Sequence, residues 1–282
     1  MAALSSAMPA PDPIAIIAGN GVYPETFVAA ARRAGVKTLV VAAFVNETKP
    51  ELAERVEAIE WFRVGQLSKM LAYFAKHQVH HAVMVGQIAP KNLFDLRPDL
   101  RTLMMMARLK QRNAESLFGA IGEEMKKEGI ELLPATTFLD EFMPKAGYLA
   151  GPHPKKRRWE DAAYGFQIAK ATSQLDIGQT VVVKNGTVLA VEAFEGTNDA
   201  MKRGGALGRG KATMVKVSKP NQDMRFDVPV VGPDTITVAA GAGVDVIAVE
   251  AGKTLLLEQE EIFRRCEQLK VTLLAVDEAT AA

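Results

Sequence analysis

The chain has 282 residues and a mass of 30.5 kDa, a length that suits about two ordinary domains. Its 34 Lys and Arg residues balance its 33 Asp and Glu residues, so no excess of positive charge indicates nucleic-acid binding. A single cysteine, Cys266, excludes an internal disulfide and a cysteine-built metal site, and its place on a predicted helix face indicates packing in the core. These features are typical of a cytoplasmic protein.

The N-terminal residues and the lengths of the apolar runs indicate whether the chain carries a signal peptide or a membrane helix. Residues 1–13 are small, contain prolines and carry one charge, Asp12, so we expect a disordered lead-in rather than a signal peptide. The longest apolar runs reach roughly eight residues, far short of the ~20 that a membrane helix needs. The sequence therefore predicts no membrane-spanning segment, while contact with a membrane surface stays open.

The first half of the chain alternates strand and helix patterns. Apolar runs predict strands at 14–17, 38–42, 82–85 and 130–133, and apolar spacing predicts helices over 24–33, 66–76, 97–112 and 114–127. Strands that are apolar throughout and separated by helices indicate a parallel sheet covered on both faces. We therefore predict an α/β chain whose N-terminal domain, residues 14–145, is Rossmann-like.

A cluster of glycines and prolines between Pro144 and Pro154 predicts a linker over residues 146–157. Beyond it we predict an α+β domain with a mixed sheet, residues 158–282. Its predicted helices cover 159–173 and 258–269, and its predicted strands cover 180–184, 187–192, 213–217, 244–249, 254–257 and 271–276. Asn185-Gly186 between the first two strands is a strong hairpin signal.

A glycine turn follows the first predicted strand. Gly19, Asn20 and Gly21 stand before a helix, where backbone N–H groups can hold a phosphate. Glu47 follows the next strand, as the ribose-binding acid of a dinucleotide site does. The third glycine of that fingerprint would fall at Pro24. The turn is therefore a plain connection, a phosphate, sugar or nucleotide contact, or an NAD site.

A second group lies between Glu192 and Arg203, where a predicted strand gives way to a helix. Thr197 or Asn198 suits the helix N-cap, and Asp199 suits its first turn. The group either caps the helix and forms a solvated rim, or offers oxygen ligands to Mg²⁺ or to a hydroxylated substrate. The candidate substrate-binding residues here are Glu192, Glu195, Gly196, Thr197 and Arg203.

Two basic stretches have two interpretations each. Residues 203–211 are glycine-rich and predict a loop that either covers an anionic ligand or is merely flexible. Residues 155–158, Lys-Lys-Arg-Arg, predict a solvated helix start or linker, or a contact with an anionic membrane or phosphate.

The segment from Lys219 to Gly232 alternates charged and apolar residues. In an extended segment, Asp223, Arg225 and Asp227 would point to one face. The two carboxylates would hold a metal ion or a water, and the arginine would take a phosphoryl oxygen. A surface strand can alternate in the same way, but the flanking prolines favour a functional segment.

Four blocks of the sequence together resemble one family. They are Ile-Ala-Gly-Asn-Gly-Val-Tyr-Pro at 17–24, Leu-Asp-Ile-Gly-Gln at 175–179, Val-Glu-Ala-Phe-Glu-Gly-Thr at 191–197, and the segment 219–232. In this order they resemble the LpxI-type UDP-2,3-diacylglucosamine diphosphatases, and the resemblance covers nearly the whole chain after Pro13. The chain departs from the usual pattern at Asn198, which is inserted before Asp199, and at the basic run 155–158.

The resemblance implies a cytoplasmic enzyme of lipid A, and hence lipopolysaccharide, biosynthesis that acts peripherally at the cytoplasmic face of the inner membrane. Such enzymes hydrolyse the pyrophosphate of UDP-2,3-diacylglucosamine with Mg²⁺, giving 2,3-diacylglucosamine 1-phosphate (lipid X) and UMP. It also implies a homodimer, a lipid held between the two domains, and an essential acid in the Arg-x-Asp-x-Pro part of the motif, which is Asp227 here.

We therefore expect Asp227 to bind or orient Mg²⁺ and its water, Asp223 to support it as a further metal ligand, and Arg225 to steady the leaving phosphate. Gly19, Asn20, Gly21 and Gln222 complete the candidate substrate-binding set. The alternatives are a nucleotide- or phosphate-binding protein without hydrolase activity, a related nucleotide-sugar phosphohydrolase, and an NAD oxidoreductase.

Overall fold

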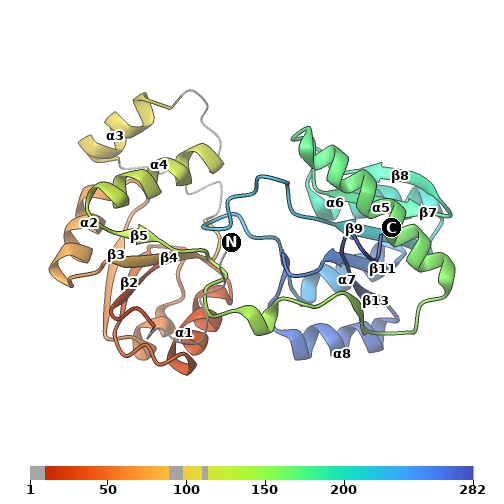
Figure 1. Ribbon diagram of the computed structural model, residues 1–282, viewed down its shortest axis with the longest axis horizontal. Coiled ribbons are helices and arrows are strands. Elements are labelled where there is room, and N and C mark those ends of the chain that lie inside the picture. Colours follow the sequence, from red (N-terminus) through yellow and green to blue (C-terminus); the bar gives the residue numbers. More distant parts are fainter. Residues whose placement is uncertain (1–9, 89–97, 110–113, 282) are drawn as a thin grey trace. The chain divides into compact units, whose positions relative to one another are not determined.

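The computed structural model describes residues 10–88, 98–109 and 114–281 (Figure 1). The chain divides into an N-terminal unit, Met1–Leu139 with Asp223–Asp227, and a C-terminal unit, Asp140–Gln222 with Val228–Ala282. Most of the predicted lead-in and both ends of the predicted helix over 97–112 lie outside the described residues. No helix within the described ranges is long and apolar enough to cross a membrane.

The N-terminal unit contains the predicted parallel sheet. Its described strands are β1 (Ile14–Ala18), β2 (Leu39–Phe44), β3 (Ala58–Phe62), β4 (His81–Val85) and β5 (Glu131–Leu132), in the spatial order β3-β2-β1-β4-β5. Its described helices are α1 (Tyr23–Arg33), η1 (Pro50–Arg55), α2 (Leu67–Lys76), α3 (Leu100–Ala107) and α4 (Ala114–Lys127). The strand order reverses between β1 and β4, which is the switch point where ligands bind to sheets of this topology.

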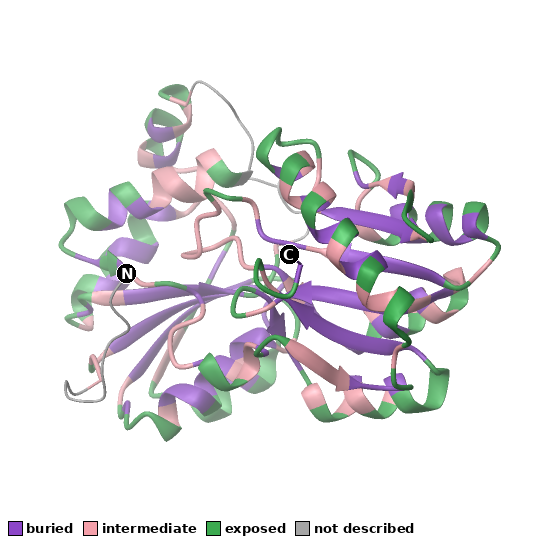
Figure 2. Cartoon of the chain, turned by 45° about the vertical axis from the view of Figure 1, so that its right-hand side comes forward, coloured by how far each residue is buried: buried purple, intermediate pink, exposed green. Residues whose placement is uncertain are grey.

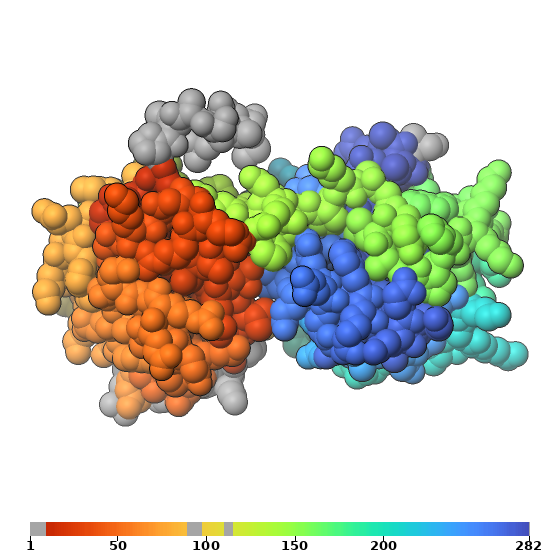
Figure 3. Space-filling model, turned by 90° about the horizontal axis from the view of Figure 1, so that it is seen from below, coloured from red at the N-terminus to blue at the C-terminus, as the bar shows by residue number. Residues whose placement is uncertain are grey.

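Both faces of this sheet are covered, as its apolar strands require. Every residue of β1 and β2 is buried (Figure 2). Helices α2 and α4 lie over one face and α1 over the other (Figure 1), and α1 belongs to the red surface of this unit in Figure 3. The edge strand β3 was not predicted, because only Phe62 of its five residues is buried and its pattern is therefore mixed.

The C-terminal unit contains a mixed sheet, as predicted. Its strands are β6 (Gly147–Ala150), β7 (Thr180–Lys184), β8 (Thr187–Val191), β9 (Ala212–Lys216), β11 (Val244–Glu250) and β13 (Thr272–Val276), in the order β6-β13-β11-β9-β7-β8. Strands β10 (Val230–Val231) and β12 (Leu255–Leu256) pair separately. The helices described here are η3 (Asp140–Phe142), α5 (Lys156–Gln174), α6 (Thr197–Gly208), α7 (Pro233–Ala242) and α8 (Gln259–Leu269).

Two hydrophobic layers enclose this second sheet. On one side Phe166 of α5 packs against strand residues such as Val183 and Val215. On the other, α6, α7 and α8 pack on the sheet, with Met201 and Cys266 among the buried residues. Helix α8 belongs to the blue surface of this unit in Figure 3. Cys266 is fully buried, as expected, and burial raises the pKa of its thiol to about 12.

The predicted linker is not an open connection. Residues Gly147–Ala150 form β6, which pairs antiparallel with β13 at the edge of the sheet. The surrounding glycines and prolines indicated a break, but Gly147 and Gly151 take positive φ and simply bound a short apolar strand. The basic run that follows opens α5, where Arg158 donates to Asp245 over 2.8 Å. The basic run 155–158 is therefore the start of a helix, as the first of its two interpretations predicted.

The predicted glycine-rich loop over 203–211 is wrong for most of its length, because α6 continues to Gly208. Its glycines allow close packing rather than flexibility. A Cβ atom on Gly204 would lie 2.5 Å from Val182, and one on Gly205 would lie 1.8 Å from the carbonyl oxygen of Ala242. The glycines therefore allow α6 to pack closely against β7 and α7.

Candidate functional site

The loop Asp223–Asp227 was predicted in the C-terminal domain but packs on the N-terminal unit. The backbone N–H of Ala135, after β5, donates to the carbonyl oxygen of Met224 over 2.8 Å. The ring of Phe226 packs against Phe118 of α4, with centroids 5.7 Å apart. We call these five residues the acidic loop. Its chemistry therefore belongs to the Rossmann-like unit.

The acidic loop is a turn, which corrects the predicted extended segment. The carbonyl oxygen of Asp223 accepts hydrogen bonds from the backbone N–H groups of Phe226 over 3.2 Å and of Asp227 over 2.9 Å. Strand alternation therefore does not set the directions of its side chains. A turn brings residues two and four positions apart close together, so Asp223 still contacts Arg225.

Asp223 and Arg225 form a two-pronged ion pair. The guanidinium donates from Nε to Oδ1 over 2.9 Å and from Nη2 to Oδ2 over 2.7 Å. The Arg225 side chain, and then its backbone N–H, hold the pKa of Asp223 below its usual range against the opposing effect of burial. Both carboxylate oxygens of Asp223 are thus engaged, so this residue orients Arg225 in the observed arrangement.

Asp227 differs from Asp223 in having an unengaged carboxylate. It is partly exposed, and across the described part of the chain its side chain makes no hydrogen bond or ion pair. Nor do the described residues contain a group of three or more His, Cys, Asp or Glu side chains that could hold a metal ion. A metal at this loop would therefore need ligands from a bound substrate besides Asp227.

The glycine turn after β1 uses its own backbone donors. The N–H of Gly19 donates to Val85 over 2.8 Å, that of Asn20 to Gln87 over 2.7 Å, and that of Gly21 to the side chain of Asn20 over 2.6 Å. A Cβ atom on Gly19 would lie 2.5 Å from the Gln87 carbonyl oxygen. These three N–H groups are not open to a phosphate, which favours the interpretation as a connection at the switch point.

The residues predicted between Glu192 and Arg203 do come together in the C-terminal unit. The hydroxyl of Thr197 donates to Oε1 of Glu192 over 2.9 Å, and Arg203 donates to Glu195 and to the carbonyl oxygen of Val191. The Arg203 side chain lowers the pKa of Glu195. Gly196, with φ +82°, is the N-cap of α6, so the predicted N-cap at Thr197 or Asn198 is wrong. Asp199 is exposed and pairs with Lys202.

The C-terminal unit carries buried polar atoms that no described residue satisfies. Oε2 of Glu192, Oε1 of Gln179 and Nε2 of Gln222 are all buried without a hydrogen-bond partner. Glu192 and Gln179 are neighbours, because the N–H of Glu192 donates to the carbonyl oxygen of Thr180 and Gly178 lies directly against the Glu192 backbone. Unsatisfied buried polar atoms are costly, so the two carboxyl and amide oxygens suit a ligand that donates hydrogen bonds, and Nε2 of Gln222 suits one that accepts.

Sequence reasoning missed two hydrogen-bonded groups, one that supports the acidic loop and one in the C-terminal unit. The Tyr23 hydroxyl donates to the carbonyl oxygen of Ala135 over 2.8 Å, and so supports the residue that binds Met224. Glu250 is buried and accepts from the N–H and hydroxyl of Ser218, and from Lys170, just before the loop. Tyr23 lies inside the first family block, residues 17–24, and this position was the one sequence signal that could have indicated its role.

The fold and the site define a two-unit α/β protein that carries an acidic loop on a Rossmann-like sheet and a polar cluster on a mixed sheet. The family model described as the LpxI N-terminal domain matches residues 13–142, and the one described as the LpxI C-terminal domain matches residues 145–274. The chain belongs to the LpxI family. UDP-2,3-diacylglucosamine pyrophosphatase LpxI of Caulobacter vibrioides is 29% identical over 275 residues, which cover 94% of this chain and 97% of that relative.

Proposed function

We propose that this protein hydrolyses the diphosphate of UDP-2,3-diacylglucosamine, giving 2,3-diacylglucosamine 1-phosphate and UMP. Membership of the LpxI family and a match over 97% of a relative named for this pyrophosphatase activity support the class of enzyme. The observation that carries the proposal to a residue is the unengaged carboxylate of Asp227 in the acidic loop. A carboxylate without protein partners is open to water, metal or substrate.

Diphosphate hydrolysis adds one water across the P–O–P bond, and it needs that water to be positioned and the charge on the phosphoryl oxygens to be neutralised. Asp227 would orient the water and accept hydrogen bonds from it. Arg225, held by Asp223, would present its remaining guanidinium N–H groups to a phosphoryl oxygen. The loop thus offers one open carboxylate and one oriented cation, which are the two elements the reaction requires.

Mg²⁺ is part of the proposal. It usually keeps several waters and binds through one or two carboxylates together with substrate phosphates, rather than in an all-protein cage. Asp227 with the substrate's diphosphate would fit this rule, whereas Asp223 is occupied by Arg225. When bound, the ion would neutralise phosphoryl charge.

We assign a separate binding role to the polar cluster of the C-terminal unit. The buried acceptors of Glu192 and Gln179 would take hydrogen bonds from sugar hydroxyls or from the imide N–H of uracil, and Nε2 of Gln222 would donate to a carbonyl or phosphate oxygen. Thr197 and Arg203 hold Glu192 and Glu195 in place for this contact.

The proposal also includes a homodimer that acts peripherally at the cytoplasmic face of the inner membrane, where the lipid substrate is found. Exposed apolar side chains on α3 support a surface contact of this kind, since Leu100, Leu103 and Met104 are each at least half exposed. Co-sedimentation with phospholipid vesicles and the mass in solution test these two parts.

The test of the proposed function is product formation from UDP-2,3-diacylglucosamine with Mg²⁺ or with EDTA. We expect UMP and the lipid 1-phosphate in equal amounts, and only with Mg²⁺. Equal turnover of UDP-N-acetylglucosamine would instead indicate a general nucleotide-sugar phosphohydrolase. Absence of product from protein that unfolds cooperatively would refute hydrolysis and leave a binding protein.

A further inference from the structure

The first family block, residues 17–24, contains a tyrosine that contacts a distant part of the same unit. Tyr23, the first residue of α1, is 8% exposed, and its hydroxyl donates to the carbonyl oxygen of Ala135, 112 residues further along the chain, over 2.8 Å. Burial raises the pKa of Tyr23 well above its usual range, so the hydroxyl keeps its proton and remains a donor. A residue beside the glycine turn therefore holds the chain that follows β5.

Helix α1 supports the segment after β5 with two side chains of one face. We call this segment, residues 134–139, the supporting loop. Besides the Tyr23 hydrogen bond, the ring of Phe27 packs on that of Phe138, with centroids 6.0 Å apart. Tyr23 and Phe27 are four residues apart and so lie on the same face of the helix. The supporting loop therefore rests on α1 at both Ala135 and Phe138.

The supporting loop in turn holds the acidic loop. The N–H of Ala135 donates to the carbonyl oxygen of Met224 over 2.8 Å, while its carbonyl oxygen accepts from Tyr23. The two peptide groups meet at one Cα atom, so fixing the carbonyl group limits the rotation that would carry the N–H away from Met224. Met224 lies between Asp223 and Arg225. A relay of two hydrogen bonds thus runs from the Tyr23 hydroxyl to the backbone of the acidic loop.

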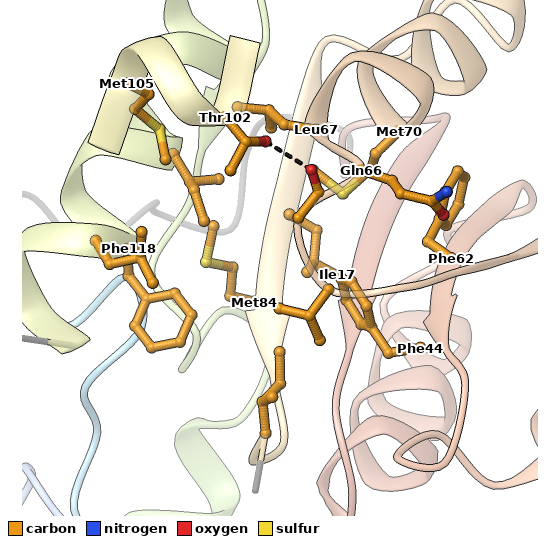
Figure 4. A pocket seen from close by; sticks show the side chains of 15 residues that line it. Ile17, Phe44, Phe62, Gln66, Leu67, Met70, Met84, Thr102, Met105 and Phe118 are labelled. Atoms are coloured by element: carbon orange, nitrogen blue, oxygen red, sulfur yellow. Dashed lines mark hydrogen bonds between the residues drawn. The ribbon is translucent and has the colours of Figure 1, made fainter. Parts of the chain in front are cut away.

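The second anchor of the acidic loop is apolar. Phe226 packs on Phe118, which lines an apolar pocket together with side chains such as Met84 and Met105 (Figure 4). Packing of this kind is non-directional, whereas a hydrogen bond depends on the angle between its groups. Within the described residues, no further hydrogen bond joins the acidic loop to the rest of the N-terminal unit. The Ala135 contact therefore sets the direction in which the loop faces.

We propose that Tyr23 is a positioning residue: through Ala135, its hydroxyl fixes the direction in which the acidic loop presents Asp227 to the substrate. This inference rests on the proposed function, in which Asp227 orients the attacking water. It also assigns a role to the glycine turn, whose N–H groups are not open to a phosphate. Gly21, with φ +93°, turns the chain from β1 into α1 and thereby places Tyr23 against the supporting loop.

Tyr23→Phe tests the inference, because it removes one oxygen atom and keeps the ring. With UDP-2,3-diacylglucosamine as substrate, we expect kcat to fall about fivefold, as for the loss of one hydrogen bond, while KM changes less than about twofold. Tyr73→Phe is the matched control. Tyr73 on α2 is 7% exposed, and its hydroxyl is buried without a partner among the described residues, so this variant should keep the wild-type kcat. Cooperative unfolding in urea shows that both variants fold.

A second background separates positioning from a general effect on the fold. In Asp227→Asn the carboxylate to be positioned is absent, so adding Tyr23→Phe should lower kcat by less than about twofold. A merely structural role would lower kcat by the same factor in both backgrounds. The inference is overturned by that result, by a wild-type kcat in Tyr23→Phe, or by an equal loss in Tyr73→Phe. Each of these results would leave the proposed function intact.

Hydrogen exchange separates the two proposals. If the wild type does not hydrolyse the substrate, the proposed function fails, and the relay is tested through the exchange of the Ala135 N–H with solvent deuterium. Tyr23→Phe should speed this exchange at least about tenfold relative to that of Ile16 in β1, because the supporting loop opens locally. Such a selective change would still support Tyr23 as the residue that holds the acidic loop. An equal change at both N–H groups, or none at Ala135, would overturn the inference.

Discussion

The ring of Phe226 packs on that of Phe118 at a centroid separation of 5.7 Å and an interplanar angle of 40°. Phe226 stands between Arg225 and Asp227, so this contact fixes the two proposed reactive side chains on the N-terminal unit. It also places the acidic loop beside the apolar pocket that Phe118 lines. A single aromatic pair thus joins the acidic loop to helix α4.

Phe226→Ala should release the acidic loop. We expect a loss of about 1–3 kcal/mol in the free energy of unfolding, because a packed ring and an aromatic pair are removed, and a larger loss in kcat than in the binding of UMP. Urea unfolding and steady-state kinetics measure both. Phe194→Ala is the control, because the Phe194 side chain is fully exposed and its removal should change neither quantity.

Asp223 and Arg225 should act as one unit. Asp223→Asn and Arg225→Lys each abolish the two-pronged ion pair, and we expect each to lower kcat/KM about tenfold. The double variant should lose little more than either single variant, because the same interaction is removed in all three. Kinetics of the three variants form a double-mutant cycle. Multiplying losses would show that the two residues act independently.

Gly19 should tolerate no side chain. In Gly19→Ala the new Cβ atom would press on the backbone of Gln87, and we expect a cost of about 1–3 kcal/mol in the free energy of unfolding. Gly119→Ala in α4 is the matched control. It meets nothing within 4 Å and should stabilise the helix by up to about 1 kcal/mol. Equal effects at the two positions would contradict the packing at the switch point.

Glu250 should make the free energy of unfolding depend on pH in the acidic range. Burial alone would raise the pKa of Glu250, but hydrogen bonds from Lys253, Ser218 and Lys170 outweigh it and lower that pKa. A lowered pKa in the folded state contributes stability above the unfolded value, and this contribution is lost as the pH falls through the folded pKa.

Glu250→Gln should therefore unfold about 1–3 kcal/mol more easily at neutral pH and lose less stability than the wild type as the pH falls below about 4.5. Urea titrations at several pH values measure both effects. The expectation fails if both proteins respond to acid in the same way.

Features formed by residues close together in the sequence could be predicted. The polar group of Glu192, Thr197 and Arg203 was predicted because a strand end and the next helix bring near neighbours together, but its individual hydrogen bonds were not. The buried strands β1, β2 and β4 were foreseen because their apolar runs have one stable environment. The edge strands β3 and β6 lack this signal, since partial exposure and flanking glycines conceal them.

Long-range packing could not be predicted from these patterns. The acidic loop packs on the N-terminal unit through Phe118 and Ala135, which are far from it in sequence. The glycines of α6 indicated a loop because their close partners, Val182 and Ala242, are identified only by the fold. The pocket is likewise assembled from several separate strands and helices, and no segment taken alone indicates it.

The most direct test of the account is the turnover of UDP-2,3-diacylglucosamine by Asp227→Asn beside Asp199→Asn. Asp199 is exposed and paired only with Lys202 among the described residues, so its variant should hydrolyse the substrate at the wild-type rate. Asp227→Asn keeps the size of the side chain but removes its charge, and we expect it to lose more than about 10²-fold in kcat with unchanged stability. Near-normal turnover by Asp227→Asn would contradict the account.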